Sequence, residues 1–293
     1  MRFGYFPGCS LHGTAREFDE SLRAISGPLD LDLVEIEDWS CCGATSAHAT
    51  NHLLSVALPA RNLALAEAQG HDAVIAPCAA CFNRLAGARH QIAADGALAG
   101  RMAGLLGRPF ANTVAVKNVV DVLRQLGPAI RGKVVKPLAG LKVACYYGCL
   151  LVRPAAVCNF DDPEDPAAME DVVSATGATP VRWNMRLECC GGGFSIPRTG
   201  SVIRLGRAII ADARAAGAET IVVACPMCHS NLDFRQSAMA LRGEAPMPVL
   251  FLSELVGLAF GLDADRLGMG RHYVSTTPLS AFAQNPPPGK EVR

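Results

Sequence analysis

The sequence lacks an excess of charge of either sign, because 27 Lys and Arg balance 27 Asp and Glu. General attraction to nucleic acid or to an anionic membrane surface is therefore not expected. The sequence also lacks a long apolar run. The longest, residues 249–262, is interrupted by Ser253 and Glu254 and is shorter than the roughly 20 residues that cross a bilayer. We expect no transmembrane segment.

Three sequence signals are also missing. The first residues, MRFGYFPG, lack the basic, apolar and small-residue order of a secretory signal, so we expect a cytoplasmic protein. There is no C-x2-C-x2-C-x3-C-P run for ordinary cubane clusters. There is no G-x-G-x-x-G after a strand either, since Gly191, Gly192 and Gly193 follow cysteines. We expect no electron relay and no dinucleotide site within the chain.

Cysteine, by contrast, is abundant, and ten of the 12 cysteines form a duplicated C…CCG…CxxC pattern. The pattern comprises Cys9, Cys41, Cys42, Cys78 and Cys81 in the first half, and Cys149, Cys189, Cys190, Cys225 and Cys228 in the second. The two gaps are 31 and 35 residues in the first half and 39 and 34 in the second. A pattern repeated in full predicts two equivalent thiolate-rich sites.

The chemistry of these sites follows from the residue type and the count. Disulfides are not expected in a reduced cytoplasm, and vicinal cysteines fit disulfide geometry poorly. A structural zinc ion or a cubane 4Fe–4S cluster takes four ligands, so five cysteines in each repeat leave one unexplained. Gly43 and Gly191 follow the vicinal pairs and permit the contorted loop that would let adjacent thiols converge. Two zinc sites with one idle cysteine each remain an alternative.

The apolar pattern predicts an α/β fold in two homologous repeats. Strands are expected at 2–6, 31–36, 73–76, 142–146, 180–183 and 220–224, and helices at 14–25, 53–69, 167–175 and 203–216. The stretches beginning at Val114 and Val249 match as a strand that turns into a helix. Alternating strands and helices imply parallel sheets. We divide the chain into domains at 1–137 and 138–265 and a C-terminal tail at 266–293, flexible over 271–293.

The predicted strands place the first cysteine and the CxxC motif of each repeat after strand ends. In open α/β sheets ligands gather at that edge, where helix N-termini present backbone N–H groups and positive dipole ends. Such an edge suits an anionic, thiolate-bound cluster.

The two cysteine repeats closely resemble the CCG domains in the B subunit of heterodisulfide reductase and in its bacterial relatives. Cys145-Tyr-Tyr-Gly-Cys149 with Arg153-Pro154 is similar to the second half of that protein. The resemblance covers nearly all of residues 1–265. It implies that each set of five cysteines holds one noncubane 4Fe–4S cluster, and that the repeats are related by a pseudo-twofold axis.

The resemblance also implies an activity and partners. A disulfide between the two clusters would receive one electron from each and be released as two thiols, or the reverse reaction would oxidise thiols or bound sulfur. The chain would be an oxidoreductase acting on sulfur groups. Its electrons would come from a protein like the family's C subunit, which carries cubane 4Fe–4S clusters, and from a flavin-containing protein like the A subunit. Substrates implied are a disulfide, a thiol or a protein-bound sulfur species, as in a bacterial sulfur-oxidising complex.

Five further residues are weaker candidates. Cys145 and Cys158 lie outside the repeat and are expected to be buried free thiols rather than ligands. His229 follows Cys228 and could donate a hydrogen bond or a proton at the site, although a structural role is the expectation. The other two are arginines near the cluster cysteines that could bind an anionic substrate, Arg153 and Arg198.

Two other functions remain open. The chain could be the iron–sulfur electron-transfer subunit of a lactate- or glycolate-oxidising complex, whose members share CCG repeats. It could also be a zinc-stabilised interaction protein without catalytic activity.

Overall fold

Two four-stranded parallel sheets organise the chain, as the computed structural model shows for residues 1–45, 47–239 and 243–284. The first sheet has the order β2-β1-β3-β4 and the second the order β6-β5-β7-β8. The strands are β1 Arg2–Tyr5, β2 Asp32–Glu35, β3 Ala73–Ile75, β4 Ala115–Lys117, β5 Lys142–Tyr146, β6 Thr179–Val181, β7 Thr220–Val223 and β8 Val249–Phe251. The α/β class and the parallel sheets predicted from the sequence are confirmed.

The strands form where short apolar runs are flanked by turn residues. All four residues of β7, Thr-Ile-Val-Val, are buried, as expected for a central strand covered on both faces. The register is equivalent in the two sheets, with Tyr5 opposite Ile75 in the first and Tyr146 opposite Val223 in the second. The strands that lead to the cysteines therefore occupy matching positions.

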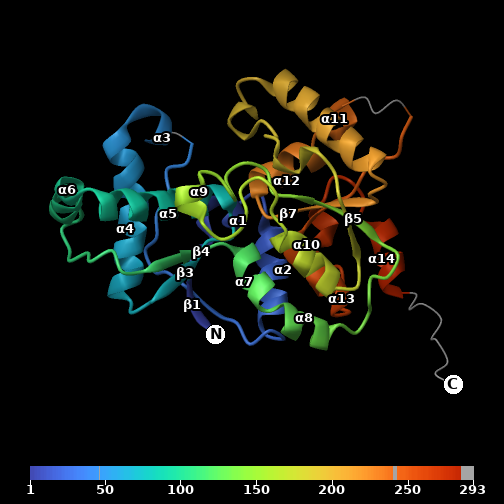
Figure 1. Ribbon diagram of the computed structural model, residues 1–293, viewed down its shortest axis with the longest axis horizontal. Helices are drawn as coiled ribbons and strands as arrows, with labels where there is room; N and C mark the ends of the chain where they lie inside the picture. The colour runs from blue at the N-terminus through green and yellow to red at the C-terminus, as the bar shows by residue number, and fades with distance from the viewer. Residues whose placement is uncertain (46, 240–242, 285–293) are drawn as a thin grey trace.

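Helices connect and cover the strands (Figure 1). In the first half they are α1 Gly8–His12, α2 Arg16–Ser26, α3 Ala47–Thr50, α4 His52–Ala68, α5 Ala79–Ala94, α6 Gly96–Leu106, α7 Val119–Gln125 and α8 Gly127–Lys133. The second half has α9 Ala155–Cys158, α10 Ala168–Ala175, α11 Thr199–Ala215, α12 Pro226–Asp233, α13 Leu252–Ala259 and α14 Thr277–Gln284. Short 3-10 turns occur at η1 Met185–Leu187, η2 Gly192–Phe194, η3 Gln236–Met239 and η4 Met269–Arg271.

The two halves are joined through four central helices, α2, α7, α10 and α13 (Figure 1). Helices α2 and α10 are equivalent, because each lies between the first two strands of its sheet, and α7 and α13 are equivalent because each follows the last strand. Helix α2 packs on α13, and α10 packs on α7. In both contacts, a helix between the first two strands of one sheet packs on the helix that follows the last strand of the other sheet. The halves are therefore arranged about a pseudo-twofold axis.

Buried contacts fix the α2–α13 interface. The ring of Phe18 stacks on that of Phe251 with centroids 4.2 Å apart, and the hydroxyls of Ser21 and Ser253 are hydrogen-bonded at 2.7 Å. All four residues are fully buried. The equivalent strands and helices thus share one continuous core.

The C-terminal segment, residues 266–284, packs against both halves. Its apolar side chains Leu267, Met269 and Leu279 are buried, and Arg271 forms an ion pair with Glu20 of α2 at 2.7 Å. The expected flexible tail is therefore wrong for residues 271–284, because Val274 and Leu279 are buried and α14 packs on α13. The remainder of that prediction, residues 285–293 with its three consecutive prolines, lies outside the described residues.

The longest apolar stretch forms β8 and α13, which belong to the core. Within residues 1–45, 47–239 and 243–284, no helix combines the length and the apolar character needed to cross a bilayer.

Candidate functional site

The fold brings three cysteine-bearing segments to the carboxyl edge of each sheet. In the first repeat, Cys9 lies in α1 directly after β1, the vicinal pair lies in the loop after β2, and Cys78 is the N-cap residue of α5 after β3. In the second, Cys149 follows β5 and Cys225 is the N-cap residue of α12 after β7. Parallel strands end at one edge, so these segments converge there.

The thiols of each repeat lie in contact. Cys42 Sγ is 3.4 Å from Cys81 Sγ, and the equivalent pair, Cys190 and Cys228, is 3.5 Å apart. Four further pairs of thiols are close enough to shift each other's pKa: Cys41 and Cys9, Cys149 and Cys189, Cys78 and Cys81, and Cys225 and Cys228. The structure thus gathers the ten cysteines of the repeated pattern into two groups of five.

The glycine after each vicinal pair shapes the loop. Gly43 and Gly191 have φ of 73° and 83°, the left-handed region that glycine adopts without strain. In this turn the Gly43 N–H points at Cys41 Sγ, 3.4 Å away, and the Gly191 N–H points at Cys189 Sγ, 3.3 Å away. The backbone is therefore already arranged to stabilise a thiolate at the first cysteine of each pair.

The two groups of five meet at the boundary between the repeats. The pKa of Cys78 is raised well above its ordinary value, first by a hydrogen bond to Cys225 of the other repeat and then by burial. Both thiols are buried. The first cysteines of the two CxxC motifs are thus neighbours across the boundary between the sites.

Exposure divides each group into an outer and an inner part. Cys9, Cys41 and Cys189 are exposed and Cys149 is half-buried, whereas the other six are buried. Each site is closed on one side by its CxxC motif and is open to solvent at the first cysteine and at the first of the vicinal pair. A small molecule could therefore reach both groups.

The equivalent exposed cysteines Cys41 and Cys189 differ in acidity. The pKa of Cys189 is lowered to about 5, mainly by a hydrogen bond from Cys149 and then by the backbone N–H groups of Gly191 and Gly192. Burial raises the pKa of Cys41. Cys189 is thus a thiolate at neutral pH in the metal-free chain, and Cys41 is a thiol.

We predict a corresponding difference in alkylation of the reduced, metal-free protein. At pH 6, iodoacetamide should modify Cys189 at least about tenfold faster than Cys41, because the thiolate is the nucleophile, although its intrinsic reactivity falls with its pKa. Peptide mass spectrometry measures both rates. The rate at Cys189 should fall with its thiolate fraction below pH 5, where Cys189 becomes protonated. Equal rates at pH 6 would contradict the geometry described.

Two glycines that line the sites were not predicted from the sequence. Gly8 and Gly148 have φ of 66° and 62°. A Cβ atom on Gly8 would lie 2.9 Å from Cys81 Sγ, and one on Gly148 would lie 3.1 Å from Cys228 Sγ. The signal was present in the sequence, because glycine precedes the first cysteine of both repeats.

We expect Gly8→Ala to empty the first site. The methyl group would displace Cys81 Sγ, and the left-handed backbone would add a strain of about 1–2 kcal/mol. Iron content after anaerobic isolation should fall by about half. Gly107→Ala is the matched control, because Gly107 has φ of 61° and no atom within 4 Å of its Cβ position. Equal iron loss in both variants would show that strain alone acts and not the contact with sulfur.

The residue three positions after the last cysteine distinguishes the two sites, and it too was not predicted. In the second repeat, Asn231 Nδ2 lies 3.6 Å from Cys190 Sγ and 3.3 Å from the carbonyl oxygen of Cys190. In the first repeat this position is Arg84, whose positive charge contributes to lowering the pKa of Cys42. The first site therefore has a cation where the second has a neutral amide.

The weaker candidates lie elsewhere. The imidazole of His229 contacts the carbonyl of Val249 at 3.1 Å and His272 at 3.2 Å, and within the described chain no hydrogen bond joins it to a thiol. Arg153 pairs with Glu164 at 3.0 Å, and Arg198 is exposed at the start of α11.

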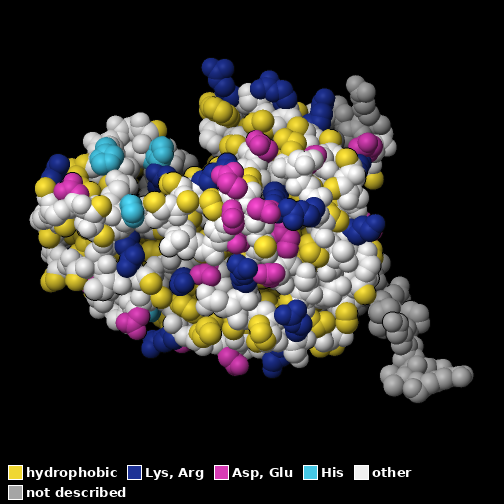
Figure 2. Space-filling view, viewed as in Figure 1, with side chains coloured by type: hydrophobic (Ala, Val, Ile, Leu, Met, Phe, Trp, Pro, Cys, Tyr) yellow, Lys and Arg dark blue, Asp and Glu magenta, His cyan; other side chains and the backbone are white. Residues whose placement is uncertain are grey.

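Figure 2 shows acidic and basic side chains intermixed over α7 and α10 on the face it presents.

The two cysteines outside the pattern are buried, as expected. Cys145 is fully buried, and its carbonyl accepts a hydrogen bond from Trp183 Nε1 at 3.0 Å. The Cys158 thiol donates to the carbonyl of Leu150 at 3.7 Å. Neither belongs to the two groups of five.

Comparison with known proteins adds to this geometry. Residues 3–86 and 143–233 each match the cysteine-rich domain family CCG. The chain is 36% identical over 282 residues to the 8-methylmenaquinol:fumarate reductase membrane anchor subunit of Wolinella succinogenes, covering 94% of this chain and 98% of that protein.

Archaeal proteins are similar over the same length. The B subunit of the ferredoxin/F(420)H(2)-dependent CoB-CoM heterodisulfide reductase of Methanosarcina acetivorans is 30% identical, with 93% of this chain and 94% of that protein covered. A protein of Archaeoglobus profundus that is named as like the B subunit of heterodisulfide reductase is 25% identical, with 91% and 93% covered.

A solved structure shares the fold. The crystal structure of a hypothetical protein from Helicobacter pylori superposes with a TM-score of 0.76 over 94% of this chain and 52% of that chain, at 11% identity.

Proposed function

This chain belongs to the CCG cysteine-rich domain family that includes the B subunit of heterodisulfide reductase, and from that membership we propose that it is the catalytic subunit of an oxidoreductase complex that splits or forms a bond between two sulfur atoms. Each repeat would contribute one iron–sulfur cluster. The observation that carries the proposal is the pairing of two equivalent five-thiol groups, which lie close enough for Cys225 of one to raise the pKa of Cys78 of the other.

The donor set suits iron–sulfur clusters. Thiolates are the usual ligands of such clusters, and Gly8 and Gly148 leave room at the inner cysteine of each site that a side chain would fill. Five thiols gathered at each site exceed the four that zinc takes. The ligands would be Cys9, Cys41, Cys42, Cys78 and Cys81 for one noncubane 4Fe–4S cluster, and Cys149, Cys189, Cys190, Cys225 and Cys228 for the other.

Bound clusters would supply one electron each and iron atoms that accept sulfur. The net reaction is balanced when one disulfide takes up two electrons and two protons and leaves as two thiols. The chain's own residues hold the two sites against each other, and they leave Cys9, Cys41 and Cys189 open to solvent. A substrate with two linked sulfur atoms matches two neighbouring sites.

Electrons would come from partner proteins in the complex. A protein like the family's C subunit, with cubane 4Fe–4S clusters, and a flavin-containing protein like its A subunit fill this role in the proposal, because the sequence has neither the cubane motif nor a dinucleotide motif. The substrate class is a disulfide, a thiol or a protein-bound sulfur species.

Turnover by the isolated complex tests the proposal. With a reduced viologen dye as electron donor, the complex should consume two equivalents of dye for each disulfide and release two thiols. A complex that carries iron and oxidises the dye with other acceptors but leaves disulfides and persulfides unchanged would overturn the sulfur chemistry.

A second function rests on the similarity to the fumarate reductase subunit, which covers 98% of that protein. In this function the two sites pass electrons from a quinol towards the reduction of fumarate. It belongs to the same class as the lactate- or glycolate-oxidising alternative. Oxidation of the reduced dye by fumarate, or reduction of an oxidised dye by a hydroxy acid, with no response to disulfide, favours this function.

A further inference from the structure

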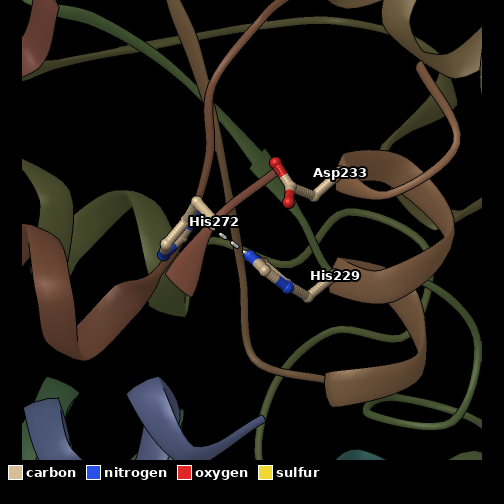
Figure 3. A group of neighbouring side chains, drawn as sticks. All are labelled: His229, Asp233 and His272. Atoms are coloured by element: carbon tan, nitrogen blue, oxygen red, sulfur yellow. Dashed lines mark hydrogen bonds between the residues drawn. The ribbon is translucent and has the colours of Figure 1, made fainter. Parts of the chain in front are cut away.

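A group of metal-ligating side chains lies outside the two thiol sites, where the C-terminal segment meets α12 (Figure 3). One ligand atom from each of His229, Asp233 and His272 lies within 4.8 Å of the others. His229 and Asp233 are buried, four residues apart on α12, and Figure 3 shows the two imidazole rings turned toward each other. Two histidines and one carboxylate form a ligand set typical of zinc and other divalent transition metals.

The remote nitrogen of each imidazole faces a buried carboxylate. His272 Nε2 is 2.8 Å from Glu254 Oε1, and His229 Nδ1 is 3.8 Å from Glu17 Oε1. Histidines that bind metals usually donate their other ring N–H to a carboxylate, which fixes the tautomer and the ring orientation. Both histidines are therefore placed as metal ligands with an outer carboxylate.

The backbone holds the third ligand. The carboxylate of Asp233 accepts hydrogen bonds from the N–H groups of Tyr273 at 2.7 Å and Val274 at 3.2 Å. These two residues directly follow His272, so the same contact positions both Asp233 and His272. Each carboxylate oxygen keeps a second lone pair for an ion.

The arrangement without an ion leaves one nitrogen unpaired. When His272 is neutral with its Nε2–H toward Glu254, its Nδ1 carries a lone pair that faces His229 Nε2 at 3.2 Å. The carbonyl oxygen of Val249, 3.1 Å from the same nitrogen, is another acceptor. His229 Nε2 must then carry the proton, and His229 Nδ1 stays buried without a hydrogen bond.

A cation between the rings removes this penalty. His229 Nε2 would then bind the ion through its lone pair, and its Nδ1–H would face Glu17. The positive charge would also offset the buried carboxylates of Glu17, Asp233 and Glu254. The Val249 carbonyl oxygen could complete four donors.

We propose that His229, Asp233 and His272 bind one divalent transition-metal ion of the zinc class, which fastens the C-terminal segment to the second repeat. The ion would join the second repeat and the C-terminal segment directly, and the first repeat through Glu17. This site is separate from the thiol sites and does not depend on the reaction they carry out.

Zinc binding to protein whose thiol sites are loaded with iron tests this assignment. After removal of loosely bound metal with a chelator, the wild-type protein should retain or take up about one zinc per chain, measured by mass spectrometry of the metals. Zinc should raise Tm by roughly 5 °C. Asp233→Asn and His272→Gln should each weaken zinc binding at least tenfold while keeping the iron. His52→Gln is the control, because His52 lies on α4 and contacts Gln91.

Cobalt separates this site from the cysteines. Thiolate-bound cobalt(II) absorbs strongly in the near ultraviolet, so the site predicted here should give only weak visible bands. A strong thiolate band, zinc binding unchanged in both variants, or no zinc bound by the loaded wild-type protein would overturn the proposal. If a variant does not fold, the Tm of the wild-type protein decides, because an unchanged Tm with zinc also contradicts the site.

Discussion

Replacing Cys81 with alanine should remove the iron of the first site and leave that of the second. The thiol of Cys81 contacts Cys42 at 3.4 Å and packs on Gly8, so its loss leaves a gap at the buried side of the site. Iron content should fall by about half, and disulfide turnover by at least about 100-fold, because one remaining cluster supplies one electron to a two-electron bond. Cys228→Ala should give the mirror result.

The control for these variants is Cys145→Ala. Cys145 is a fully buried thiol that lies outside both groups of five, so its loss removes the same chemical group from the core without touching a site. Iron content and turnover should stay near the wild-type values. Equal iron loss in Cys145→Ala and Cys81→Ala would contradict the assignment of the sites, as would full iron content in Cys81→Ala.

Replacing Phe18 with alanine should destabilise both halves of the protein together. Phe18 of α2 stacks on Phe251 at the end of β8, with ring centroids 4.2 Å apart and both rings fully buried. Truncation of a buried aromatic ring lowers the free energy of unfolding by about 3–5 kcal/mol. Urea unfolding of the metal-free, reduced protein, followed by circular dichroism, measures the change.

Phe194 provides the comparison for this variant, because it is 50% exposed in the loop after the second vicinal pair. Phe194→Ala should change the free energy of unfolding by no more than about 0.5 kcal/mol. If Phe18→Ala behaves like Phe194→Ala, or if the two halves unfold in separate transitions, the shared interface between the repeats is wrong.

Much of the fold followed from the sequence because its signals are local. The runs that end at Cys78 and Cys225 are short, apolar and rich in β-branched residues, and they form β3 and β7. The matching stretches at Val114 and Val249 form β4 with α7 and β8 with α13. Repetition added weight to each prediction, since a pattern found in both halves had to fit the same element twice.

Other features depend on contacts between distant residues, which a sequence does not show. The proximity of Cys78 to Cys225 arises only when the two sheets meet. The role of Asn231 beside Cys190 requires the turn of α12 against the vicinal loop. The sequence of residues 271–284 indicates a tail because its few apolar residues become buried only when the segment folds back, with α14 against α13.

Metal analysis of the protein, isolated without oxygen and left untreated, tests the central claim most directly. Two five-thiolate clusters predict about eight iron atoms per chain with matching acid-labile sulfide, and a paramagnetic signal on oxidation. About two zinc atoms per chain with no iron would contradict the account, because zinc held by four thiolates in each repeat leaves the fifth cysteine without a role.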